Sequence, residues 1–135
     1  MNRIQNWPTI LANEIALAST DLFEWGKHDC CSFAARIVYA ITSKNFMNSF
    51  PPYCTEEEAG VILGTNGGVE GIATQCLGDP VPVMYAQRGD VLLLLPVGST
   101  NGESLGICID HRGAFASAKG LIKYPVAGCK LAWRV

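Results

Sequence analysis

The chain has 135 residues, of which 49% are hydrophobic and only 16% are charged, and its formal net charge is −2 at pH 7. This length suits one compact domain, 1–135, that buries a core without metal or disulfide support. The weak negative charge provides no basic stripe, which argues against nucleic acid as a partner. No apolar run reaches the roughly 20 residues that span a bilayer. Hydrophobic surface left on so weakly charged a domain indicates contact with a partner protein.

The first residues and the cysteines indicate a reducing compartment. Residues 1–5 lack the apolar core of a secretory signal, so we expect synthesis in the cytoplasm. Six cysteines are scattered along the chain, at positions 30, 31, 54, 76, 108 and 129. Reduced thiols are expected there, and none of the spacings typical of zinc or iron–sulfur ligands is present. We therefore expect no metal and no cofactor. A thiol metal or iron–sulfur site around Cys30, Cys31 and distant cysteines is the weaker alternative.

The N-terminal part, about 8–78, has the spacing of helices. Pro8 suits the first turn of a helix that apolar residues extend to about Phe23. A second helix is expected from Asp29 to about Ile41. Further short helices are predicted over 55–64, where Thr55 begins a capping-box pattern, and over 69–77.

The remainder, about 81–135, has the pattern of strands. The continuous apolar run 91–95 predicts a central strand buried on both faces. Strands over 105–109 and 114–118 flank a hairpin turn at 110–113, and two more are expected over 121–126 and 130–135. An extended segment is expected at 81–83. Helices followed by an antiparallel sheet make an α+β domain.

One stretch, 25–35, carries chemistry. Gly26 permits a tight turn, and Asp29 can cap the helix that starts at Cys30. A thiol at a helix N-terminus is biased toward thiolate, and nearby N–H groups can stabilise an oxyanion. Cys30 shares the apolar face of the helix with Phe33, whereas Cys31 is turned by about 100° and is expected to pack on the first helix. The alternative is that Cys30 is a small buried hydrophobe.

The order of short motifs resembles the NlpC-type branch of papain-like cysteine peptidases. The segment 25–30 (WGKHDC) resembles the Gly-x-Asp-Cys segment of that family, with one extra residue between Gly and Asp. The segment 88–91 (RGDV) matches the entry to a strand of the family, and the segment 104–109 (SLGICI) matches the next strand. The ending 132–135 (AWRV) is similar to a branch of such domains encoded by tailed bacteriophages and prophages.

The resemblance implies a papain-like fold and, in active members, cleavage of cell-wall peptides by a Cys–His pair with a third polar residue. The cysteine of the family corresponds to Cys30. Its histidine is expected on the second hairpin strand, where this chain has Ala, Phe, Ala and Ser at 114–117. Thiol cleavage of amides needs a general base and an acid. The chain offers only His28 and His111, at a turn and at a hairpin tip.

The resemblance, together with the absence of a histidine at 114–117, leads us to expect one of two functions. The favoured one is a non-catalytic structural component of a phage tail tip or baseplate, with other tail proteins as partners and the virion as its final location. The alternative is an active peptidoglycan endopeptidase used during phage infection. It would have Cys30 as nucleophile, His28 or His111 as base and Asp29 as helix cap.

Overall fold

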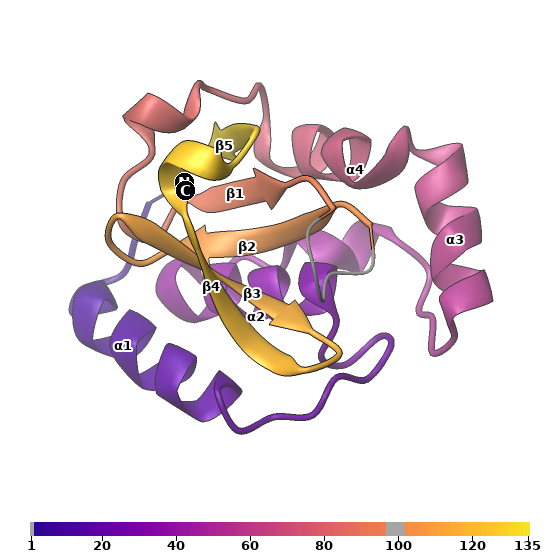
Figure 1. The fold of residues 1–135 in the computed structure, drawn as a ribbon, viewed down its shortest axis with the longest axis horizontal. Coiled ribbons are helices and arrows are strands. Elements are labelled where there is room, and N and C mark those ends of the chain that lie inside the picture. Colours follow the sequence, from indigo (N-terminus) through magenta and orange to yellow (C-terminus); the bar gives the residue numbers. More distant parts are fainter. Residues whose placement is uncertain (1, 97–101) are drawn as a thin grey trace.

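The computed structural model describes residues 2–96 and 102–135, with only the backbone of Ser49. Helices precede strands along this part of the chain (Figure 1). The helices are α1 (Trp7–Ala18), α2 (Cys30–Thr42), α3 (Glu56–Thr65) and α4 (Gly68–Leu77), with short 3₁₀ turns η1 (Phe46–Ser49), η2 (Val83–Tyr85) and η3 (Val126–Gly128). The strands are β1 (Val91–Leu94), β2 (Ser104–Cys108), β3 (Arg112–Ser117), β4 (Gly120–Pro125) and β5 (Leu131–Trp133). The predicted α+β class is confirmed.

The strands form one antiparallel sheet in the order β4-β3-β2-β1-β5. In its register Val91 lies opposite Ile107 of β2 and opposite Trp133 of β5. Both faces of β1 are buried, because its alternate residues belong to two separate hydrophobic clusters on opposite sides of the sheet. Leu93 faces the helices, whereas Leu92 packs on the outer face under residues of η2 and η3. The predicted central strand is thus confirmed.

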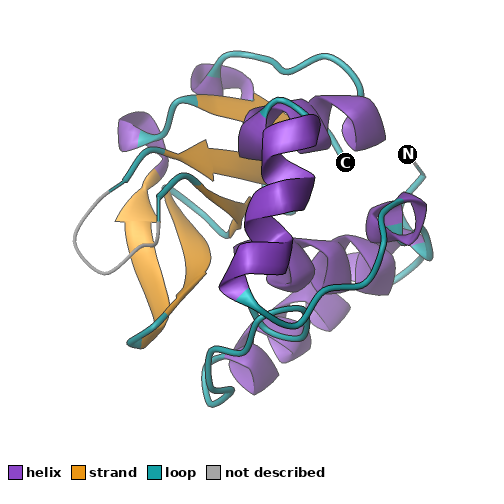
Figure 2. Cartoon of the chain, turned by 90° about the vertical axis from the view of Figure 1, so that its right-hand side faces the viewer, coloured by secondary structure: helices purple, strands orange, loops and turns teal. Residues whose placement is uncertain are grey.

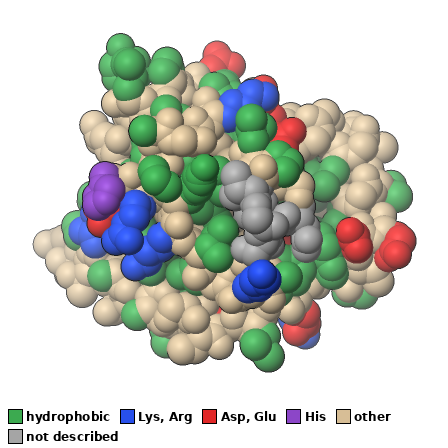
Figure 3. Space-filling view, viewed as in Figure 1, with side chains coloured by type: hydrophobic (Ala, Val, Ile, Leu, Met, Phe, Trp, Pro, Cys, Tyr) green, Lys and Arg blue, Asp and Glu red, His purple; other side chains and the backbone are tan. Residues whose placement is uncertain are grey.

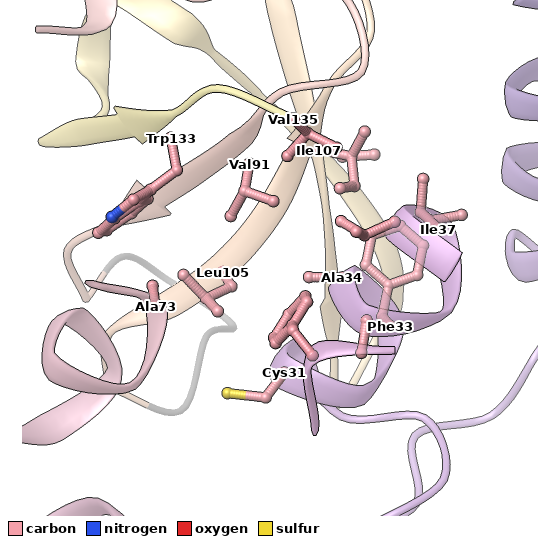
Figure 4. Packing of buried hydrophobic residues seen from close by; sticks show 14 of the residues in the cluster. Cys31, Phe33, Ala34, Ile37, Ala73, Val91, Leu105, Ile107, Trp133 and Val135 are labelled. Carbon is pink, nitrogen blue, oxygen red and sulfur yellow. The ribbon is translucent and has the colours of Figure 1, made fainter. Parts of the chain in front are cut away.

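Helix α2 covers the inner face of the sheet, so the molecule has a sheet layer and a helix layer (Figure 2). Phe33, Ala34 and Ile37 on α2 are fully buried. They lie beside Val91 and Ile107 of the sheet (Figure 4). This packing fixes the N-terminus of α2 against β2.

Two predicted boundaries are wrong. Helix α1 ends at Ala18 rather than near Phe23, because the Ser19 and Thr20 hydroxyls donate to carbonyl oxygens of the last turn. The expected extended segment at 81–83 is reduced to an isolated bridge between Val81 and Ala132, after which the chain turns into η2. The other predicted helices and strands are present, with ends shifted by a few residues.

A cluster that we call the Arg3 clasp joins both ends of the chain to the start of β1. The Arg3 guanidinium donates to Asp90 Oδ1 at 2.9 Å, to the Arg88 carbonyl oxygen at 2.6 Å and to the Val135 carbonyl oxygen at 2.8 Å. Asp90 Oδ1 also accepts the Val135 N–H, and the guanidinium lies 4.1 Å from the centre of the Trp7 ring.

None of the helices in the described residues is long and apolar enough to cross a membrane.

Candidate functional site

The segment before α2 makes a tight turn. Glu24 and His28 exchange two backbone hydrogen bonds across it. Gly26 has φ +82°, a conformation that L side chains rarely adopt. A Cβ at Gly26 would also collide with the Tyr53 carbonyl oxygen. Glycine is required here for both reasons, and the turn rests against the loop that follows η1.

Asp29 organises the start of α2, as predicted. Its Oδ1 accepts the Ser32 N–H and its Oδ2 accepts the Gly26 N–H, both at 2.8 Å. The Asp29 N–H in turn donates to the Ser32 hydroxyl, which completes a capping box. The Tyr53 hydroxyl donates to the same carboxylate, and burial together with this charge raises the pKa of Tyr53. Asp29 is only 2% exposed, so its geometry is fixed.

Two sulfur atoms follow this cap at the first two positions of α2. The Sγ atoms of Cys30 and Cys31 are 3.9 Å apart. Cys30 is half-buried, and Cys31 is 6% exposed. The Cys31 sulfur points away from Phe33 and Ile37 (Figure 4). The expectation that Cys31 packs on the first helix is therefore wrong, since Cys31 lines a hollow together with Cys30.

The surroundings of Cys30 favour its thiolate. Hydrogen-bond donation from Cys31 lowers the pKa of Cys30, and donation from the Leu105 N–H and the Ser104 hydroxyl acts in the same direction. Burial and the Asp29 carboxylate oppose this shift but do not reverse it. The pKa of Cys31 is raised well above its ordinary range, first because its S–H is used in that bond and also because it is buried.

The hollow beside the thiols has a volume of about 60 Å³. One water needs roughly 10–15 Å³, so the space accepts a small group. Its walls are mainly apolar side chains from the Phe23–Trp25 segment, η1, α3, α4 and β3, and the polar groups near it are few. The lining residues are Phe23, Trp25, Asp29, Cys30, Cys31, Met47, Tyr53, Ala59, Ile62, Leu63, Val69, Ile72, Glu103, Ser104 and Ala116.

Neither of the chain's two histidines lines this hollow. His28 is 5% exposed and stands edge-on to Phe33, and neither ring nitrogen makes a hydrogen bond within the described residues. Its Nδ1 lies 3.9 Å from Asp21 Oδ2, and desolvation by burial lowers the pKa of His28. His111 is at the tip of the β2–β3 hairpin with a side chain that is 80% exposed. The structure thus brings neither proposed base to Cys30.

Three groups near Cys30 were missed by sequence reasoning. Ser104 begins β2 and its hydroxyl favours the Cys30 thiolate, Tyr53 lies near Asp29, and Glu103 lines the hollow. On the second hairpin strand, where the resemblance places a histidine, Ala116 lines the hollow. The strand predicted over 105–109 corresponds to β2, which begins one residue earlier, at Ser104. The sequence contains no comparable signal for Tyr53.

All six cysteines are free thiols in the structure. Within the described ranges, 2–96 and 102–135, no three His, Cys, Asp or Glu side chains are grouped as a metal ligand set. Cys54 is exposed and its thiol lies 3.4 Å from Glu58 Oε1, whereas Cys76 donates to the Phe46 carbonyl oxygen. Cys108 and Cys129 lie on the other face of the sheet, in the outer cluster.

Comparison with protein families gives a match over almost the whole chain. Residues 2–135 match the family model described as a domain of unknown function, DUF6950. The chain belongs to this family. The match covers both the cysteine segment and the whole sheet, so the site described above lies inside the family domain. No curated protein matches the chain.

Proposed function

We propose that this domain is a non-catalytic structural component of a phage tail tip or baseplate, built on a papain-like fold of the NlpC type. Three features support the fold assignment. A capped helix presents Cys30, that helix packs on an antiparallel sheet, and the RGD segment (88–90) leads into β1 while the LGI segment (105–107) lies within the adjacent strand β2. The phage assignment rests on the motif resemblance described above.

The observation that carries the non-catalytic assignment is the set of groups around Cys30. Amide cleavage needs a general base for the thiol and then an acid for the leaving amine. The thiolate is held here by neutral donors, namely Cys31, Ser104 and the Leu105 N–H. Both histidines of the chain lie elsewhere, and Asp29 is occupied by the helix cap. The thiolate therefore has no imidazole to protonate a leaving amine.

The surface supports an assembly role. Several large hydrophobic side chains are exposed on the helices and on the loops around the sheet, among them Leu22 at 86%, Met84 at 79% and Val61 at 67%. On the sheet side, hydrophobic side chains gather in the middle, with charged side chains around them (Figure 3). Such surface on a small domain favours burial against other subunits.

A second candidate function is favoured by one specific observation. The lowered pKa of Cys30 and the N–H groups of the first turn of α2 are the arrangement that an acyl-transfer nucleophile uses. In an active peptidoglycan endopeptidase, Glu103 at the rim of the hollow would have to supply the base. We rank this function below assembly, because the acid for the leaving amine would also have to come from that one carboxylate.

The test combines virion analysis with a peptide-release assay. Mass spectrometry of purified virions of a phage encoding this chain is expected to detect the chain as a tail component. The purified chain, incubated with bacterial sacculi, is expected to release no peptides, while a known endopeptidase releases them from the same preparation. Peptide release that disappears in Cys30→Ala would support the endopeptidase. Absence of the chain from the virions would overturn the assembly role.

A further inference from the structure

We propose that Cys30 is a site of thiol–disulfide exchange, where it forms a lasting mixed disulfide with a small disulfide that carries an uncharged apolar substituent. The proposal does not depend on the assembly role, because it concerns the chemistry of the two thiols and the hollow. It rests on the 3.9 Å spacing of the sulfurs, the partial exposure of Cys30 and the lining of the hollow.

Disulfide exchange suits a thiolate that has no acid–base partner. The leaving group is itself a thiolate, which departs without a proton, whereas a leaving amine needs one. The Cys31 thiol, the Ser104 hydroxyl and the Leu105 N–H stabilise a charged sulfur but supply no base or acid that titrates near neutral pH. The set of groups that is too poor for amide cleavage is therefore sufficient for exchange.

The step balances without any further reactant. The Cys30 thiolate attacks one sulfur of a disulfide R–S–S–R′, a Cys30–S–S–R bond forms, the S–S bond of the reagent breaks, and R′–S⁻ leaves with the electron pair. The small disulfide is the oxidant, since Cys30 and the departing sulfur exchange oxidation states. No proton is transferred in the step.

Cys31 leaves the mixed disulfide intact. Its pKa is raised, so it stays a protonated donor rather than an attacking thiolate. A Cys30–Cys31 disulfide would bring the sulfurs from 3.9 Å to about 2.05 Å, within the first turn of α2 that the Asp29–Ser32 capping box holds. Cys31 therefore promotes the reaction of Cys30 without resolving its product.

The hollow determines the preferred substituent. The aromatic and aliphatic side chains of Phe23, Met47 and Ile72 form its walls, and its volume of about 60 Å³ fits a short alkyl group. The charged groups in its lining, Asp29 and Glu103, are both acidic. A substituent that carries a carboxylate would meet like charges there, whereas a methylthio group would not.

The test uses the wild-type chain and methyl 2-pyridyl disulfide at pH 6, with peptide mapping of each cysteine over time. Cys54 is the internal control, because it is more exposed than Cys30 but the Glu58 carboxylate raises the pKa of its thiol. We expect methylthio labelling of Cys30 at least about threefold faster than of Cys54, because the larger thiolate fraction of the thiol with the lowered pKa outweighs its weaker nucleophilicity. In urea the two rates are expected to converge.

Two further measurements examine the thiol pair and the hollow. Cys31→Ala removes an S–H donor and is expected to slow labelling of Cys30 at pH 6, whereas Cys31→Ser keeps a donor and restores it. The carboxyethyl analogue of the reagent has the same leaving group but carries a carboxylate, which Asp29 and Glu103 repel. Reaction of each reagent with 2-mercaptoethanol gives its intrinsic reactivity. Relative to that reactivity, the analogue is expected to label Cys30 more slowly than the methyl reagent does. The proposal would be overturned if Cys54 were labelled faster than Cys30. It would also be overturned if the peptide with Cys30 and Cys31 lost two hydrogens without gaining an adduct, the mass change of a disulfide between these two residues.

Discussion

Two buried aspartates, Asp29 and Asp90, occupy similar positions in two regions of the molecule. Each is 2% exposed and directly precedes an element, α2 for Asp29 and β1 for Asp90. A glycine with positive φ lies three residues before Asp29, at Gly26, and one residue before Asp90, at Gly89. Both accept backbone N–H bonds, from Gly26 and Ser32 at the first aspartate and from residues 87 and 135 at the second. They differ in their cation. Asp90 is paired with Arg3, whereas the donors to Asp29 from the described residues are all neutral.

The difference separates a structural charge from a charge that acts on a site. In the Arg3 clasp the guanidinium pairs with Asp90 and ties the chain ends together, although the Asp90 charge still contributes, after burial, to the raised pKa of Cys108. At the start of α2 the uncompensated Asp29 carboxylate raises the pKa of both adjacent thiols. The donors around Cys30 offset burial as well as that charge, so the pKa of Cys30 is lowered on balance.

The largest effect is expected from breaking the paired aspartate. Asp90→Ala leaves the Arg3 guanidinium and two backbone N–H groups without their acceptor in a buried place. Removing one partner of a buried pair costs about 3–5 kcal/mol, so we expect a loss of that size in the free energy of unfolding in urea. Glu70→Ala is the matched control, since it breaks an exposed pair with Lys130 that contributes about 0–1 kcal/mol. Equal losses in the two variants would contradict this account of the clasp.

The unpaired aspartate is expected to give a smaller loss of stability together with a change at Cys30. Asp29→Asn keeps a capping oxygen for Ser32 but loses the acceptor of the Gly26 N–H, at a cost of about 1–3 kcal/mol. Removal of the negative charge is expected to lower the pKa of Cys30 further. Alkylation of Cys30 as a function of pH measures that shift. A pKa that rises in Asp29→Asn would show that the carboxylate holds the donors in place rather than opposing the thiolate.

Much of the fold was predictable from the sequence, because its strongest signals are local. The apolar run 91–95, the Asp29 cap and the hairpin around 110–113 each fix an element through nearest neighbours. The end of α1 was missed because the hydroxyls of Ser19 and Thr20 compete for the last carbonyls. The Arg3 clasp was also missed, since it joins residues 3, 90 and 135 through contacts that no short pattern encodes.

In the candidate site, too, the residues with local sequence signals were predicted and those brought in by long-range contacts were not. Cys30 and Asp29 were found because a cap and a helix start are adjacent in sequence. Ser104 and Tyr53 meet them only after α2 packs on β2 and the loop after η1 folds back. Helical periodicity alone predicted that Cys31 packs on α1. It lines the hollow instead, because the packing of α2 on β2 decides which neighbours surround Cys31.

The smallest effect is expected at His28, which lies next to Asp29 in sequence but outside the hollow. Burial lowers its pKa below the unfolded value of 6.5, so the unfolded chain binds a proton more readily than the folded one. The free energy of unfolding is therefore expected to fall as the pH drops below about 6.5, with the His28 contribution complete below its folded pKa. One proton gives a slope of at most about 1.4 kcal/mol per pH unit.

Urea unfolding of wild type, His28→Phe and His111→Gln between pH 5 and 7 measures that contribution. His111 is the matched control because its side chain is 80% exposed. His28→Phe removes two buried nitrogens that make no hydrogen bond within the described residues, so it is expected to flatten the slope. His111→Gln is expected to retain the slope of the wild type. A wild-type slope that persists in His28→Phe would mean that protonation of His28 is compensated by Asp21, the carboxylate 3.9 Å away. Asp21→Asn would then steepen the slope, because it leaves the charged imidazole buried without a partner.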